Sequence, residues 1–415
     1  MQKIQNAAIR IITGAFRSSP ISSLHAETNI APIELQLHQA CTQYYLRTKR
    51  IPDRPHATAL EDFLNSTPES DFNKRIRKVV DHMEIRPLQV VPEEPRTRPP
   101  WTINVPKRCP RLHIGTKTNV PAEEMRQIFL EHLHQCHRED IAIYTDGSRT
   151  AEHVGAAAVV PALNISDTIR LSQYTSIFTA ELVAISIAVD LLLALPQKSF
   201  VICSDSSSAI HTVTSFDPSH QIAQSIQDAI HCTNKQVRFC WSPAHTGING
   251  NERADSLAKA CCTLPVSHKG ILYEDLEKAT RRSIKQIWQD EWDITVENKL
   301  HAIKPKLENR PSSCSSERRE ETNLMRLRIG HCNFSHKHLM EKKAPPNCSR
   351  CKTQLTVEYL LVYCTLYGMK RQQLFPELNQ IPPEKRLCAM LSESEYFDYR
   401  KIMNFLSSTP YKNGI

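Results

Sequence analysis

The order of apolar runs between residues 138 and 262 restricts the fold of this chain more than any other feature. Three strand-like runs follow one another with no helix between them, at residues 141–145, 155–160 and 167–173. A long run with helical periodicity then covers residues 178–195. Consecutive strands without intervening helices predict an antiparallel meander.

The second half of this segment alternates helices with strands. Strands are predicted at residues 200–204 and 237–242, and helices at 207–214, 221–234 and 250–262. Helical crossovers between strands predict parallel neighbours in one sheet. The sequence therefore predicts an α/β fold with a five-stranded mixed sheet and helices on both faces.

Four carboxylates occupy positions where these elements should expose them. Asp146 and Asp205 end strand-like runs, Glu181 lies in the first turn of the long helix, and Asp255 lies in the last helix. Taken singly, such an aspartate is commonly a turn residue and such a glutamate commonly favours a helix dipole. Together, four such acids can hold a pair of hard cations, as in two-metal phosphodiester hydrolysis.

The residues around these acids resemble the type 1 ribonuclease H family over residues 138–262. The matching motifs are T-D-G-S (145–148), T-A-E-L (179–182), S-D-S (204–206) and H-T-G-I-N-G-N-E-R-A-D (245–255). Exonucleases and integrases also use acidic two-metal sites, but the last motif is specific to ribonuclease H. The resemblance implies an RNase H-like fold and hydrolysis of the RNA strand of RNA–DNA hybrids. The alternative is a catalytically inactive nucleic-acid-binding remnant.

The resemblance also implies a role for each acid. Asp146 would bridge two Mg²⁺ ions, for which Mn²⁺ could substitute. Glu181 and Asp205 would serve the ion on the leaving-group side, and Asp255 the ion on the nucleophile side. His245 matches the family's mobile loop histidine, which is associated with proton transfer or product release.

Short polar residues beside the acids are candidates for substrate contact. Gly147, Ser148 and Ser206 are placed to meet the 2′-hydroxyl groups that distinguish RNA from DNA. Asn251 is predicted to cap the last helix, because asparagine favours that position.

The rest of the chain divides by composition into four segments. Residues 1–84 are predicted to be helical, and residues 4–15 resemble the C-terminal tail of a non-LTR retrotransposon reverse transcriptase; a generic helical hairpin is the alternative. No paired-aspartate polymerase motif is present. Residues 85–121 contain closely spaced prolines and predict an extended linker. Residues 263–330 form a basic helical region, and residues 331–415 a cysteine-containing tail.

Three cysteines in this tail have part of a metal-binding pattern. Cys348 and Cys351 have the spacing of a zinc-knuckle half-site, and Cys364 follows them. Tyr359 stands where the retrotransposon family usually has a histidine. A zinc site here would need a fourth donor, such as His331 or His336; the alternative is a metal-free tail.

Charge and hydropathy indicate where the protein acts. The net charge is +8, and residues 141–262 carry 7 basic against 10 acidic side chains, so the positive excess lies in the flanks. Basic flanks suit contact with the phosphates of an RNA–DNA hybrid, although they could equally be solvated surface. The sequence shows no long apolar run typical of a membrane span or secretory signal. We therefore expect an intracellular protein, in the cytoplasm or nucleus, with reduced cysteines.

Overall fold

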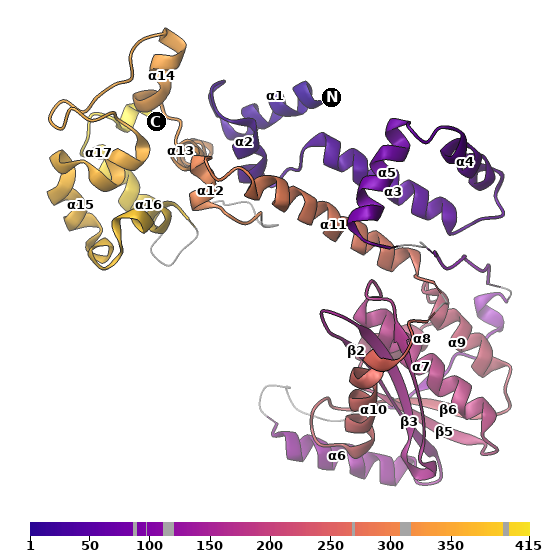
Figure 1. Ribbon diagram of the computed structural model, residues 1–415. Coiled ribbons are helices and arrows are strands. Elements are labelled where there is room, and N and C mark those ends of the chain that lie inside the picture. Colours follow the sequence, from indigo (N-terminus) through magenta and orange to yellow (C-terminus); the bar gives the residue numbers. More distant parts are fainter. Residues whose placement is uncertain (86–88, 97, 111–119, 268–269, 308–316, 393–397) are drawn as a thin grey trace. The chain divides into compact units, whose positions relative to one another are not determined.

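The computed structural model describes residues 1–85, 89–96, 98–110, 120–267, 270–307, 317–392 and 398–415 (Figure 1). Parts of the predicted linker, at residues 86–88, 97 and 111–119, lie outside this description. The chain forms two compact units. The first, which we call the helical unit, comprises Met1–Thr42, Ser70–Met83 and Thr280–Ile415. The second, the sheet unit, comprises Gln43–Glu69 and Glu84–Ala279.

A six-stranded mixed sheet, in the order β1-β6-β5-β2-β3-β4, forms the centre of the sheet unit. The strands β2, β3 and β4 are antiparallel, whereas β2, β5, β6 and β1 are parallel. Their bounds are β1 (Lys107–Arg108), β2 (Ile141–Arg149), β3 (Val154–Val160), β4 (Ile165–Leu171), β5 (Ser199–Ser204) and β6 (Gln236–Trp241). The predicted meander with parallel neighbours, an RNase H-like α/β fold with helical extensions, is confirmed.

Helices cover both faces of the sheet because side chains alternate between its faces along each strand. Ile143, Ile202 and Phe239 share one core with α7, α8 and α9. Tyr144 and Val201 share the opposite core with α6 and α10. The bounds are α6 (Ala122–Cys136), α7 (Ile177–Ala194), α8 (Ser207–Val213), α9 (Gln221–His231) and α10 (Asn249–Ala260).

The helix α7 is apolar on nearly all sides. Among the described helices it alone is long and apolar enough to cross a membrane by length and composition. More than half of it, 56%, is buried inside the protein. It therefore has the features of a core helix, and its N-cap Ser176 accepts a hydrogen bond from the Thr179 backbone.

Two features of the sheet differ from the prediction. The strand β1, formed by two residues of the proline-rich segment, makes the sheet six-stranded rather than five-stranded; it pairs with β6 at the edge, where neighbouring prolines are tolerated. Asp146 is not at the tip of a strand, since β2 continues to Arg149. Pairing of β2 with β5 ends at Thr145, whereas pairing with β3 continues. Asp146 thus lies on β2 just beyond the end of its pairing with β5.

The helical unit is built from both ends of the sequence around one apolar core. Ile9 and Leu24 pack in the same cluster as Leu327 and Phe405. Its helices include α1 (Gln2–Thr13), α2 (Ile21–Thr28), α5 (Asp71–His82), α12 (Lys299–Ile303), α13 (Arg318–Ile329), α14 (Asn333–Glu341), α15 (Gly368–Leu374), α16 (Pro383–Leu391) and α17 (Tyr399–Ser407). Three further helices, α3 (Ile33–Lys49), α4 (Pro55–Ser66) and α11 (Tyr273–Asp293), lie in the sheet unit or pass from one unit to the other.

We predict that Gly250→Ala destabilises the sheet unit. A Cβ atom at Gly250 would lie 2.2 Å from a ring carbon of Tyr144, so α10 would have to move away from β2. Overpacking of this kind costs about 1–3 kcal/mol, measurable by urea unfolding. Gly368→Ala is the control, because a Cβ there meets nothing within 4 Å. Equal unfolding midpoints for the two variants would contradict the prediction.

Candidate active site

Three of the four predicted acids converge at the end of β5. Asp146 lies on β2, Glu181 in the first turns of α7, and Asp205 directly after β5. Each contributes a carboxylate oxygen to a group in which all the oxygens lie within 4.8 Å of one another. The sheet therefore brings together residues that are up to 59 positions apart in the sequence.

The close approach of α7 to β2 depends on Gly147. A Cβ atom at this position would lie 2.6 Å from the backbone nitrogen of Glu181, so only glycine allows the helix to begin directly on the strand. The Gly147 backbone N–H also donates a hydrogen bond to the Glu181 carboxylate. Gly147 was predicted to contact substrate. In the structure its amide hydrogen-bonds Glu181, a candidate catalytic residue.

The other two predicted substrate contacts differ in their surroundings. Ser148 lies on β2 and is only 8% exposed. Ser206 is half-buried and is the N-cap of α8, where its hydroxyl oxygen accepts a hydrogen bond from the Ala209 backbone at 3.3 Å. The Ser206 and Ser208 hydroxyl oxygens also lie 3.3 Å apart, within hydrogen-bond distance.

The three acids strongly affect one another's ionisation. Burial, and then the charges of Asp205 and Asp255, raise the pKa of Asp146 from 3.8 to about 7. Burial, and then Asp146 and Asp205, raise the pKa of Glu181 from 4.5 to about 9, against the lowering effect of the Gly147 hydrogen bond. Burial also raises the pKa of Asp205. The site thus disfavours three negative charges unless a cation is present.

The donor set fits a hard divalent cation. All three ligand groups are carboxylates, and Mg²⁺ binds through carboxylate oxygens together with water and substrate phosphate oxygens. One Glu181 oxygen, Oε2, is buried and has no hydrogen-bond partner among the described residues. A buried carboxylate oxygen without a donor is costly, and a bound cation would satisfy it.

Asp255 lies near the three acids but outside their group. Its Oδ2 atom accepts a hydrogen bond from Lys259 Nζ at 2.7 Å, one helical turn further along α10. The Asp255 charge nevertheless contributes to the raised pKa values of Asp146 and Asp205. The Asp255 carboxylate is therefore near enough to interact electrostatically with Asp146 and Asp205.

His245 lies in the loop before α10, in a backbone conformation that is uncommon for residues other than glycine. Its φ angle is 53°, in the left-handed region, and its side chain is exposed. The loop is held by Thr246 Oγ1, which donates to the Pro243 carbonyl, and by the Gly247 N–H, which donates to Glu252. The charge of His245 lowers the pKa of Asp205, so the imidazole interacts electrostatically with that carboxylate.

Asn251 does not cap α10, contrary to the prediction. The helix begins at Asn249 after the N-cap Ile248, and no side chain caps it. Asn251 is instead buried; it accepts a hydrogen bond from Ser242 Oγ at 3.0 Å and hydrogen-bonds the Asp205 side chain. Its role in positioning Asp205 was missed, although it lies within the specific 245–255 motif.

The C-terminal cysteines also converge. The Sγ atoms of Cys348 and Cys351 lie 3.7 Å and 3.9 Å from that of Cys364. Within the described residues, the group of mutually close ligand atoms includes neither His331 nor His336. Tyr359 hydrogen-bonds Cys351 instead. Zinc binding by these three cysteines stays a prediction, because no histidine joins their group of close ligand atoms among the described residues.

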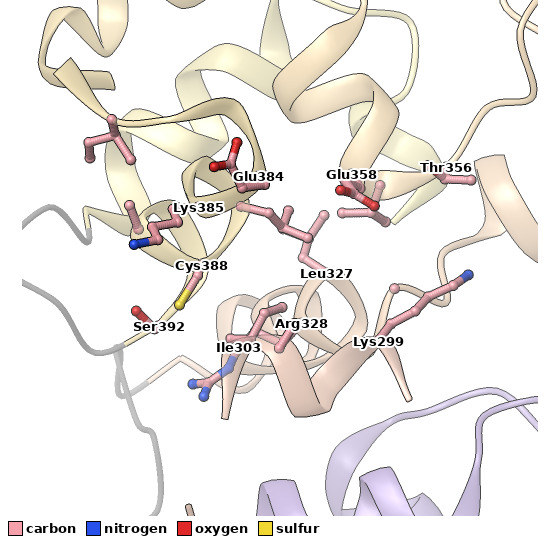
Figure 2. Close-up of a pocket in the computed structure, with 16 residues that line it drawn as sticks. Lys299, Ile303, Leu327, Arg328, Thr356, Glu358, Glu384, Lys385, Cys388 and Ser392 are labelled. Carbon is pink, nitrogen blue, oxygen red and sulfur yellow. The ribbon is translucent and has the colours of Figure 1, made fainter. Parts of the chain in front are cut away.

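The helical unit contains a separate pocket of about 680 Å³. Figure 2 shows Leu327 and Ile303 in its wall, with Lys299, Glu358 and Glu384 around them. Both carboxylates lie outside the groups of close metal-ligand atoms found among the described residues. The pocket therefore lacks the ligand geometry of the acid group.

We predict that the metal-free protein loses stability as the pH rises from roughly 5 to roughly 9, because its native state retains protons on Asp146 and Glu181 that the unfolded chain has released. Mg²⁺ should restore stability most at the upper end of this range. Glu181→Gln should flatten the metal-free curve and weaken the response to Mg²⁺. Melting temperatures with chelator or Mg²⁺ test this, with exposed Glu152→Gln as control. Parallel wild-type and Glu181→Gln curves in chelator would refute it.

Comparison with known proteins agrees with this geometry. Residues 138–263 match the family model described as RNase H. No curated protein matches the chain. The matched range contains all four acids, His245 and every strand of the sheet except β1. Residues 138–263 of this chain are therefore an RNase H domain.

Proposed function

We propose that this chain is a divalent-cation-dependent endoribonuclease that hydrolyses the RNA strand of RNA–DNA hybrids. The observation that carries the proposal is the group formed by buried Asp146, buried Glu181 and half-buried Asp205 inside the RNase H domain. Nucleic-acid binding alone does not require three carboxylates so close together. A site for divalent cations does require such a group.

Asp146, Glu181, Asp205 and Asp255 would hold two Mg²⁺ ions, for which Mn²⁺ could substitute. The bound ions would make a water molecule nucleophilic and neutralise charge on the leaving oxygen. In the reaction, the water oxygen bonds to phosphorus, the bond from phosphorus to the 3′-oxygen breaks, and the products carry 5′-phosphate and 3′-hydroxyl ends. No protein nucleophile is required.

The remaining residues of the site position these acids and move protons. The Gly147 amide holds Glu181, and Asn251 holds Asp205. Lys259 keeps Asp255 in place through an exposed contact that a cation can replace. His245, exposed beside Asp205, can carry a proton to or from the reacting groups.

Recognition of the hybrid would involve both the domain and its flanks. Ser206 is the better supported of the polar candidates for 2′-hydroxyl contact, because it borders Asp205 and is not fully buried. In the helical unit, Arg318, Arg319, Arg326 and Lys412 line a hollow of about 520 Å³. Arg326 donates to the backbone carbonyls of Gly14 and Ile415. Phosphate contact by the C-terminal flank would therefore fall mainly to exposed Arg319 and Lys412.

We also propose that the chain derives from a non-LTR retrotransposon, with the end of a reverse transcriptase preceding the RNase H domain. The support is the resemblance of residues 4–15, which form most of α1. The chain lacks a paired-aspartate polymerase motif, so polymerisation is not part of the proposed function. Genomic sequence upstream that encodes no polymerase segment would count against this origin.

We predict that Asp146→Asn abolishes cleavage of a labelled hybrid while binding, measured without metal, stays within a few-fold of wild type. The amide has the shape of the carboxylate but is a poor metal ligand. Asp190→Asn, an exposed change on α7, should cleave normally. Single-stranded RNA, duplex RNA and duplex DNA serve as substrate controls. Wild-type protein that binds the hybrid but does not cleave it with Mg²⁺ or Mn²⁺ would instead indicate an inactive binding remnant.

We predict that replacing His245 slows cleavage without abolishing it, since general acid–base help is worth ~10²–10⁴ at most. His245→Asn is the sharper variant, because asparagine tolerates the left-handed backbone conformation that alanine resists. Single-turnover rates from about pH 6 to about pH 9 measure the effect, with exposed His211→Ala as control. A His245→Asn profile identical to wild type would assign His245 a structural role only.

A further inference from the structure

A second cluster of metal-ligand side chains lies in the sheet unit, near the β1 edge of the sheet. The Sγ atoms of Cys109 and Cys240 and a ring nitrogen of His132 lie within 4.8 Å of one another. The Nε2 atom of His137 lies 3.1 Å from Cys109 Sγ. His137 lies outside the group of three mutually close ligand atoms but borders it through Cys109. Thiols and imidazoles thus lie together here, whereas the acid group consists of carboxylates alone.

Three elements contribute to this cluster. Cys109 directly follows β1, and its backbone N–H donates to the Phe239 carbonyl at 2.8 Å. Cys240 belongs to β6. His132 lies near the end of α6, and His137 immediately follows the helix. The residues span more than 130 positions of the sequence, so they do not form a local metal-binding motif that could be recognised from spacing.

The donor atoms are buried and prepared for a cation. Cys109, Cys240 and His137 are 7%, 1% and 7% exposed. The Nε2 atom of His132 is buried and has no hydrogen-bond partner among the described residues. A buried imidazole nitrogen without a donor or acceptor, beside two buried thiols, is a polar group that a bound metal ion would satisfy.

The outer contacts of His137 hold its ring as a ligand. Its Nδ1 atom lies 2.7 Å from Asp140 Oδ2, so Nδ1 donates a hydrogen bond to the carboxylate while Nε2 faces Cys109. Asp140 in turn accepts a hydrogen bond from Ser199 and lies 3.5 Å from Arg238. A carboxylate behind a histidine is the usual outer arrangement of protein zinc sites.

We propose that Cys109, Cys240, His132 and His137 bind a structural zinc ion that fastens β1 and α6 to β6. Two cysteines and two histidines are a full tetrahedral ligand set for Zn²⁺ and leave no open position for substrate. The ion would hold the segment before the RNase H domain against the edge of its sheet.

The test measures the zinc content of the purified full-length chain after dialysis, and the visible absorption of its cobalt-substituted form, which reports tetrahedral thiolate ligation. We expect Cys109→Ser and Cys240→Ser each to lose one equivalent that the wild type retains. Cys136→Ser, an exposed cysteine on α6, is the matched control and should retain it. Cys351→Ser distinguishes zinc bound by the C-terminal cysteines from zinc bound at Cys109. The equivalent that depends on Cys109 should remain in this variant.

Asp140→Asn tests the outer contact, and should weaken zinc affinity by about 10–100-fold without removing the site. If the cysteine variants fail to fold, chelation of wild-type protein provides the same test: it should lower the melting temperature and expose Cys109 and Cys240 to alkylation, identified by peptide mass spectrometry. Zinc content unaffected by Cys109→Ser, a Cys109–Cys240 disulfide, or chelation without effect on melting and alkylation would overturn the proposal.

Discussion

The sheet unit must hold three carboxylates close together, two of them buried and the third half-buried. Burial and mutual repulsion disfavour full ionisation of Asp146, Glu181 and Asp205 without a counter-charge, in keeping with the raised pKa values of Asp146 and Glu181. The surrounding fold keeps them together nonetheless. Glycine at position 147 brings α7 onto β2, and Gly250 brings α10 onto the same strand. Charge repulsion among the carboxylates would therefore favour a bound cation, and the sheet keeps the three side chains in place.

Much of this arrangement could be predicted from the sequence. Apolar runs at residues 141–145, 155–160 and 200–204 have the length and composition of buried strands, and the helical run at residues 178–195 is long and largely apolar. The acids were predicted from sequence position, because Asp146 and Asp205 end apolar runs, Glu181 lies early in the helical run and Asp255 lies in the last motif. The strand order followed from the sequence of meander and crossovers. These inferences depend on local patterns that do not change with the rest of the fold.

The parts that could not be predicted depend on contacts between distant residues. Asn251 has the residue type of a helix cap, but the burial of α10 against Tyr144 and the start of the helix at Asn249 turn its side chain toward Asp205. The two residues of β1 are too few to show a strand pattern. Cys109 and Cys240 look like isolated thiols in the sequence, and only the pairing of β1 with β6 brings them together.

The interleaved composition of the two units has a consequence for synthesis on the ribosome. The sheet unit is continuous from residue 84 to residue 279, so its sheet can form while later residues are still being added. The helical unit cannot be completed then, because Ile9 and Leu24 pack against residues beyond 290. The N-terminal helices must therefore wait, with apolar side chains exposed, until nearly the whole chain has emerged. A chain that ended soon after residue 279 would contain the complete RNase H domain, but its N-terminal helices would lack the later residues of their core.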